Sequence, residues 1–443
     1  MLMIRRYFLI GSAALLLITK TSGANIAAAQ NRTYRWNLDS CINYAVNNNI
    51  DVRKSMVVLK SGIEDVAGAK AAFLPSVSAG SSQNFTYLPS SDVNDHASYS
   101  GNYNITASYN IYQGGKRSYN LQNYNLVSKS NELSVLNNKI QIKQSVIEAY
   151  IQVLYNIETV NINKNAEEVS HKQLERGAAL LEVGSISKVD YAQLVSRYKT
   201  DYSNRIASEN SLSNAILTLK QLLEMDITDN IYVEQMNVSD DEIMALIPSK
   251  KEIYYNALDI MPQIKSGEID REIAALNVKS AKSGFRPTLS VSTGFGTSHN
   301  SNGSGSFSNR LWNNFSQNAG LSLSIPIYSN RQNRTAVNKA NLAVETADLQ
   351  LANAKKQLLQ QIESIYLDAV SAQTRYPAAV EAEKAAEETY NLTNQQFEIG
   401  MKNTLELLTA QNDLLTARQE VLRSKYTVVR NRLLLETFTS ISL

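Results

Sequence analysis

The residues best suited to chemistry in this chain lie in two short segments, each of which follows a glycine. A Ser or Asn stands three residues after the glycine and an acid stands six after it: Gly184, Ser187 and Asp190 in the first segment, and Gly400, Asn403 and Glu406 in the second. Ser and Asn are N-cap types, and an acid three positions later completes a capping box and suits the helix dipole. The pattern predicts two helix-to-helix turns, and it leaves a further role for the two carboxylates open.

Outside these turns, the residue types and spacings do not indicate catalysis. There is no phosphate loop, dinucleotide fingerprint or metal-ligand spacing, and the three histidines are scattered. We expect His96 and His299 to lie in exposed loops. Cys41 is the only cysteine, which excludes an intramolecular disulfide and favours a buried, inert position on a helix. The sequence therefore predicts neither an enzyme nor a cofactor.

The N-terminus has the layout of a secretory signal peptide. Arg5 and Arg6 precede an apolar run at residues 7–18, and the alanines at 27–29 offer a cleavage site, so we expect residues 1–29 to be removed. A membrane anchor is the alternative, but a spanning helix needs about 20 apolar residues. Cleavage removes Arg5, Arg6 and Lys20, which lowers the formal net charge from +2 to −1. This balance gives nucleic-acid binding no support.

The chain contains one large internal duplication. Ile111-Tyr112 recurs as Ile327-Tyr328, and Gly184 recurs as Gly400, both at an offset of 216 residues. Phe73-x-Pro75 recurs as Phe285-x-Pro287 at an offset of 212. We therefore divide the mature chain into a first repeat at 30–224, an acidic connector at 225–249, and a second repeat at 250–443.

Each repeat contains two segments with strict alternation of apolar and polar residues. These segments predict strands at about 76–88 and 99–112 in the first repeat, and at about 287–298 and 315–328 in the second. One face carries Ser, Asn, Thr and Gly, whereas the other carries Tyr and Phe near the ends, as in a barrel with a wet lumen and aromatic girdles. A soluble half-buried sheet is the alternative. Because four strands cannot close a barrel in lipid, a membrane barrel requires several chains.

Two long segments with heptad spacing predict coiled-coil helices. We expect long helices at about 115–182 and 187–224, and again at about 331–398 and 404–438, with a single opening helix at 38–72. Pro377 should kink or break the third of these long helices. Heptads alone also fit a soluble periplasmic coiled-coil adaptor or structural protein, which we keep as the alternative function.

The duplicated layout, the Phe-x-Pro before each first strand, the Ile-Tyr entry to each long helix and the glycine turns with an acid six residues on resemble the TolC family of outer-membrane efflux and secretion channels. The resemblance covers the chain from about 36 to 438. It implies a mainly α fold with a membrane β-barrel. In such a homotrimer an α-helical barrel continues a shared barrel of about 12 strands, four from each protomer.

The resemblance also implies a function and its partners. The trimer would be a passive conduit for small molecules or proteins that sits in the outer membrane, contacts its lipid and extends into the periplasm. At its periplasmic tip it would dock with an adaptor protein and an inner-membrane RND or ABC pump, in drug efflux or in type I secretion.

By the same resemblance, Asp190 and Glu406 would ring the periplasmic entrance, favour cations and raise one another's pKa values. Lys402 would stand where a basic residue can tie its turn to Asp190. The sequence departs from the family's pattern at Thr409, where a second acid is expected, and at Phe397, where an aromatic hydroxyl is expected. Gly184, Ser187, Gly400 and Asn403 would mark the turns that contact the adaptor.

Overall fold

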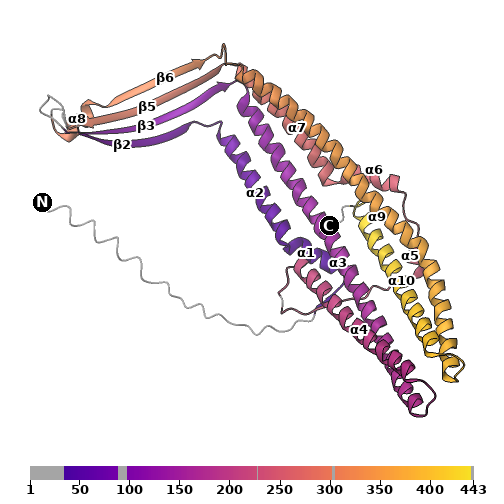
Figure 1. Cartoon of the computed structure of the whole chain (residues 1–443). Helices are drawn as coiled ribbons and strands as arrows, with labels where there is room; N and C mark the ends of the chain where they lie inside the picture. The colour runs from indigo at the N-terminus through magenta and orange to yellow at the C-terminus, as the bar shows by residue number, and fades with distance from the viewer. Residues whose placement is uncertain (1–33, 88–96, 227, 302–304, 441–443) are drawn as a thin grey trace, which may run out of the picture.

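The computed structural model describes residues 34–87, 97–226, 228–301 and 305–440. The predicted signal peptide and His96 therefore lie outside the described residues. A four-stranded sheet stands at one end of the molecule, and long helices run from it to two turns at the other end (Figure 1). Within the described residues, no helix combines the length and the apolar character needed to cross a membrane.

The sheet joins the two repeats in the order β2-β3-β5-β6, with all neighbours antiparallel. The register pairs Ala79 with Ile105 and Ile105 with Phe295, so the apolar sides of three strands lie on one face. The polar sides form the other face, where the hydroxyls of Ser78 and Thr106 hydrogen-bond at 2.9 Å. The strands span Ser76–Tyr87 (β2), Ala97–Gln113 (β3), Thr288–Asn300 (β5) and Ser316–Ser324 (β6).

Two expectations about the strands are wrong in detail. The last strand ends at Ser324, four residues before the expected end, because Pro326 has no backbone N–H for a ladder. His299 does not lie in an exposed loop. It belongs to β5 and is 4% exposed, packed against Tyr99, Tyr103 and Phe307, the last from a short helix, α8 (Phe307–Asn313).

Two helical hairpins form the long part of the molecule. In the first, α3 packs along α4, and in the second, α9 packs along α10. On the side toward the sheet, α2 and α7 continue the packing beside α3 and α9, and α3 also contacts α10, which joins the hairpins (Figure 1). The helices span Lys116–Glu182 (α3), Lys188–Leu222 (α4), Gln332–Glu398 (α9) and Thr404–Glu436 (α10).

Pro377 does not break its helix, since α9 is continuous from Gln332 to Glu398. The proline removes one backbone donor, but tertiary contacts hold its neighbours in place. The Tyr376 hydroxyl donates to Asp240 Oδ1 at 2.6 Å, and the Gln373 amide donates to the carbonyls of Ile243 and Ala245 at 2.8 and 2.9 Å. Packing against this segment therefore outweighs the tendency of proline to break a helix.

The opening helix of each repeat is interrupted, contrary to the expectation of one helix at 38–72. Asn49 ends α1 and caps α2, with its side chain accepting from Asp51 N. Met261 and Pro262 make the matching break in the second repeat, again at an offset of 212 residues. The helices span Leu38–Asn48 (α1), Ile50–Ala71 (α2), Lys250–Ile260 (α6) and Pro262–Lys282 (α7).

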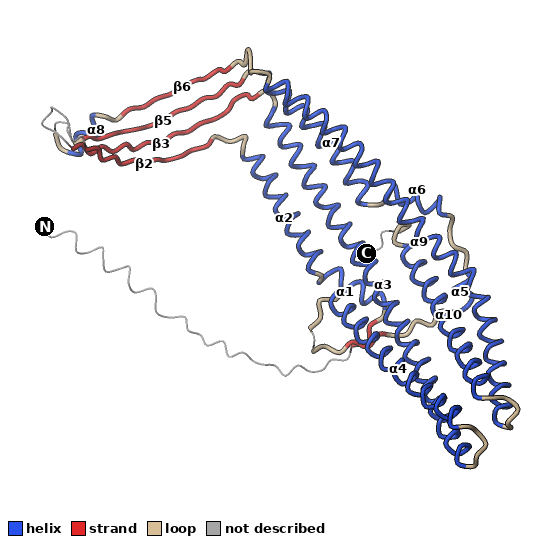
Figure 2. The backbone as a smooth tube through the Cα atoms, in the orientation of Figure 1, coloured by secondary structure: helices blue, strands red, loops and turns tan. Residues whose placement is uncertain are grey.

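The connector folds onto the helices as a layer partway along their length. A strand before α1, β1 (Tyr34–Trp36), pairs in parallel with β4 (Ile231–Val233), and α5 (Asp240–Met244) follows. Figure 2 shows this small strand pair far from the main sheet. We call β1, β4 and α5 the waist layer. Tyr150 of α3 anchors it by donating to the Glu234 carbonyl at 2.6 Å.

Cys41 lies in the core beneath the waist layer, on α1. Its side chain is fully buried among Trp36, Val146 and Leu219, and burial raises the pKa of its thiol to about 12. A thiol with so high a pKa is not ionised near neutral pH, and the thiolate is the reactive form. The sequence-based prediction of a buried helix cysteine is confirmed.

Candidate functional site: the two helix turns

The same backbone turn ends α3 and α9. Gly184 and Gly400 have φ values of 76° and 77°, in the left-handed region that glycine adopts at little cost. In the first turn, Ser185 N donates to the Leu180 carbonyl at 2.8 Å. In the second, Met401 N donates to the Gln396 carbonyl at 2.8 Å. Each glycine is thus the left-handed residue of a Schellman motif, which satisfies carbonyls that the helix end leaves free.

The helices that follow both start with a capping box. Asp190 N donates to Ser187 Oγ at 3.1 Å, and Ser187 N donates back to Asp190 Oδ2 at 3.2 Å. Glu406 N donates to Asn403 Oδ1 at 2.9 Å, and Asn403 N donates to Glu406 Oε2 at 3.1 Å. The capping role predicted for these four residues is confirmed. A role at a channel entrance stays a prediction.

The two acids differ in what surrounds their carboxylates. The Ser187 hydroxyl donates to Asp190 Oδ2 at 2.6 Å and is the largest cause that holds the pKa of Asp190 below its usual value. The Lys402 ammonium pairs with Glu406 Oε1 at 2.5 Å and is the largest cause that lowers the pKa of Glu406. Both acids are therefore ionised near neutral pH within a single protomer. The rise predicted for an assembled ring stays a prediction.

The structure brings the two turns into contact through a residue that the sequence did not single out. Thr404, the first residue of α10, is 2% exposed, and its hydroxyl lies close enough to the Asp190 carboxylate to help hold the pKa of Asp190 down. Among the described residues, Lys402 forms its salt bridge with Glu406 of the same hairpin, rather than with Asp190. Thr409 donates to the Leu405 carbonyl at 2.8 Å, within α10. The contact between the turns therefore runs from Thr404 to Asp190.

Three further polar contacts hold the two hairpins together near the turns. Arg176 of α3 pairs with Glu398 of α9 at 2.7 Å. The Gln173 amide donates to the Tyr390 hydroxyl at 3.2 Å, and Arg197 Nη1 donates to Asn412 Oδ1 at 3.5 Å. No sequence motif could have shown these pairs, because their members lie on different repeats, 217 residues apart in the case of Gln173 and Tyr390.

A buried ion pair lies behind these contacts, inside the first hairpin. Arg197 Nε donates to Asp201 Oδ2 at 2.9 Å, and the two side chains are 14% and 1% exposed. Burial raises the pKa of Asp201, while the nearby charge of Arg197 and the Ser170 hydroxyl oppose that rise. The pair therefore depends on both partners, since either charge alone would be costly in this position.

The surface of the turns is apolar between these polar groups. Five large side chains are each more than 60% exposed there: Val183, Val189, Ile399, Met401 and Leu405. Clusters of exposed apolar side chains on a folded protein mark contact surfaces more often than isolated ones do. The tip of each hairpin thus presents an apolar patch beside a fixed carboxylate.

Comparison with known proteins accounts for both the fold and the duplication. The family model described as "Outer membrane efflux protein" matches the chain twice, at residues 41–224 and 253–439. The chain is 23% identical to the outer membrane protein TolC of Escherichia coli (strain K12) over 403 residues, which cover 88% of this chain and 79% of that protein.

Solved structures with little sequence identity share the fold. The structure superposes on a crystal structure of CusC with a TM-score of 0.78 at 17% identity, covering 92% of this chain and 94% of that one. The Campylobacter jejuni CmeC outer membrane channel gives a TM-score of 0.76 at 18% identity, covering 91% and 85%.

These matches decide against the alternative of a soluble periplasmic adaptor. They also support a non-enzymatic transporter, as part of a trimeric component of an efflux system. With two family repeats that fill most of its length and a TolC-like fold, the chain belongs to the outer membrane efflux protein family and is an outer-membrane channel that extends into the periplasm.

Proposed function

We propose that three copies of this chain close into one conduit, with a shared barrel of about 12 strands and the two helix turns as its periplasmic entrance. The placement of both acid-bearing turns at the end of the molecule opposite the sheet carries the proposal (Figure 1). Asp190 and Glu406 of the three protomers would then ring one opening. Fixed carboxylates around an opening favour cations.

The sheet supports this assembly through its two unpaired edges. The strands β2 and β6 are the outer members of the order β2-β3-β5-β6, and every neighbouring pair is antiparallel. β2 and β6 therefore run in opposite directions, so β6 of one protomer can pair antiparallel with β2 of the next. An open edge is costly in lipid, which makes closure by other protomers favourable.

The apolar patches at the tips support docking of a second protein. The exposed apolar side chains of the turns include Val183, Val189 and Leu405, and they suit contact with a periplasmic adaptor. An RND or ABC pump in the inner membrane would then bind the adaptor.

We favour the efflux of small molecules, and type I protein secretion is the second candidate. Deleting the gene should lower resistance to small toxic compounds if efflux is the function; normal resistance together with the loss of an exported protein would favour secretion.

Ion selectivity tests the role of the two acids. In planar bilayers, Asp190→Asn with Glu406→Gln should shift the reversal potential under a KCl gradient toward less cation preference. Glu398→Gln is the matched control, because it removes a carboxylate that also lies near the tip, at the end of α9, but is outside the proposed ring. An unchanged reversal potential in the double variant would leave the acids with capping alone.

A further inference from the structure

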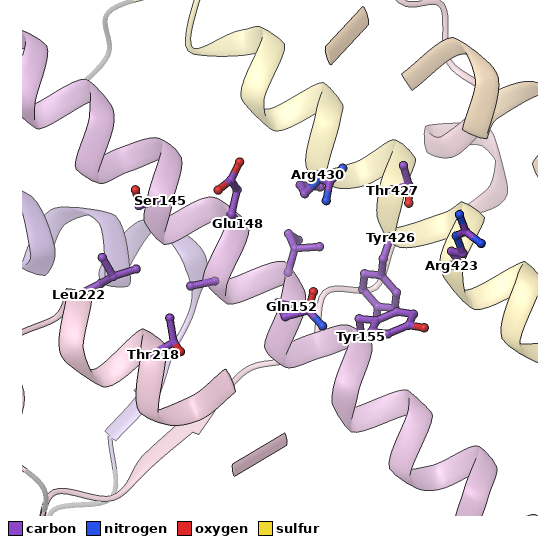
Figure 3. Close-up of a pocket in the computed structure, with 12 residues that line it drawn as sticks. Ser145, Glu148, Gln152, Tyr155, Thr218, Leu222, Arg423, Tyr426, Thr427 and Arg430 are labelled. Carbon is purple, nitrogen blue, oxygen red and sulfur yellow. The ribbon is translucent and has the colours of Figure 1, made fainter. Parts of the chain in front are cut away.

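A groove with both polar and apolar lining crosses the helices at the level of the waist layer, on the side away from it. It has a volume of about 720 Å³ and is lined by α3, α4 and α10. Figure 3 shows Glu148 and Gln152 entering it from α3, Thr218 and Leu222 from α4, and Arg423 and Arg430 from α10. The groove is thus a composite of both repeats.

Helix geometry places the groove on the face opposite the waist layer. Tyr150 of α3 donates to the Glu234 carbonyl, directly after β4. Glu148 lies two residues before Tyr150 and Gln152 two residues after it, so each is turned about 200° from Tyr150 around the helix axis. On α10, Arg432 donates to the Glu242 carbonyl of the waist layer, and Arg430 lies two residues before it. Both helices therefore direct their groove residues away from the waist layer.

This face becomes the inner surface of the proposed tube. The central helices α3 and α10 contact each other within one protomer, whereas β2 and β6 leave the two lateral edges of the sheet free for neighbouring protomers. Of the two broad faces, one carries the waist layer, which would obstruct a tube if it pointed inward. The inference below therefore rests on the proposed conduit.

The groove has a net positive charge, because its lining contains two arginines, Arg423 and Arg430, and one acid, Glu148. Arg423 and Arg430 are seven residues apart, on one side of α10. Arg423 is 67% exposed and reaches Glu420 only at 3.8 Å. Arg430 Nε donates to the Asn431 amide oxygen at 3.1 Å, and among the described residues it makes no ion pair. Two guanidinium groups thus face the groove with donors left for an anion.

The first repeat has no positive charge at the positions equivalent to these two arginines. At the 216-residue offset, the positions of Arg423 and Arg430 are Ala207 and Asn214 on α4. The basic pair is therefore peculiar to the second hairpin. Aromatic surface lies beside it, where Tyr155 and Tyr426 meet edge to face at 6.4 Å between ring centroids.

We infer that this groove is a binding site for organic anions inside the conduit, with Arg423 and Arg430 contacting a carboxylate or sulfonate group. Tyr155 and Leu222 would contact the apolar body of the same molecule. Arginine suits this role because its planar group offers paired donors to such an anion. Three such grooves would form a basic belt above the acidic entrance.

Current block by 1-naphthalenesulfonate tests this site. Purified protein in planar bilayers should show transient block, and Arg423→Gln with Arg430→Gln should raise the half-blocking concentration about tenfold, as expected for the loss of charge-assisted contacts. Lys425→Gln is the matched control, because it removes the same charge from α10 two residues from Arg423, and Lys425 does not line the groove. It should leave the half-blocking concentration unchanged.

The outcomes separate this site from the conduit itself. Equal block of the double variant and the unchanged protein would overturn the site, as would an equal effect of Lys425→Gln and Arg423→Gln. Methanesulfonate should block less than 1-naphthalenesulfonate. Equal block by the two anions would rule out the proposed contact between the ligand and Tyr155. If the unchanged protein conducts no current, the conduit fails. Equilibrium dialysis of 1-naphthalenesulfonate with the detergent-solubilised protein then tests the site. Loss of binding in the double variant supports the site, and equal binding overturns it.

Discussion

The two helical hairpins share one backbone plan but differ in their polar contacts. Both turns have a left-handed glycine, a Schellman motif and a capping box at the same relative positions. The first hairpin adds a buried ion pair, Arg197 with Asp201, and the second adds an exposed one, Lys402 with Glu406. Duplication has therefore kept the residues that set backbone geometry, while the charged side chains differ.

Removing one partner of the buried ion pair should give the largest loss of stability. Replacing Asp201 with Ala leaves the Arg197 guanidinium buried without its carboxylate, which should destabilise the first hairpin by about 3 kcal/mol. The temperature at which the purified trimer dissociates on heating measures this loss. Glu209→Gln is the control, because it removes a 45% exposed carboxylate from the same helix, where an ion pair contributes little. Equal losses in the two variants would contradict the special role of the buried pair.

Substitution of either turn glycine by alanine should cost the same stability, because the φ angles of Gly184 and Gly400 match. Gly184→Ala and Gly400→Ala each force a Cβ into the left-handed region, at a cost of about 1–2 kcal/mol. No atom lies within 4 Å of the added Cβ at either position, so strain is the only expected cost. Gly68→Ala on α2 serves as the control, since it also has open space and lies within a helix. A clear difference between the two turn variants would show that the assembled tip constrains one turn more.

The pH dependence of the two caps should give the smallest effect. Both acids have pKa values lowered in the folded chain, so their stabilising contribution is complete above the unfolded-state pKa, about 4, and is lost as pH falls through the folded value. Amide hydrogen exchange at the starts of α4 and α10 should therefore quicken in acid relative to the rest of each helix. Lys402→Gln should move this transition to higher pH in α10 and leave α4 unchanged. A shift in both helices would mean that the turns titrate together.

Local patterns predicted the repeated elements well because their causes are local. Alternation along 97–113 and heptad spacing along 116–182 depend on near neighbours, so the sequence alone indicated the strands and the long helices. The turns at Gly184 and Gly400 were predicted for the same reason. The break allowed for at Pro377 does not occur, because its helix is held by contacts with Asp240 and Ile243 of the distant waist layer and with Ala245 beside it.

The sequence by itself determined the duplication, the capped turns and the amphipathic strands, since glycine conformation, N-cap chemistry and side-chain period act within a few residues. Only the tertiary structure decided which residues of the two repeats meet. It placed Thr404 against Asp190, paired Arg176 with Glu398, and brought Glu148 to the same groove as Arg430. Such contacts join positions that are remote in the chain, so they follow from the packing of the two hairpins against each other and from no local pattern.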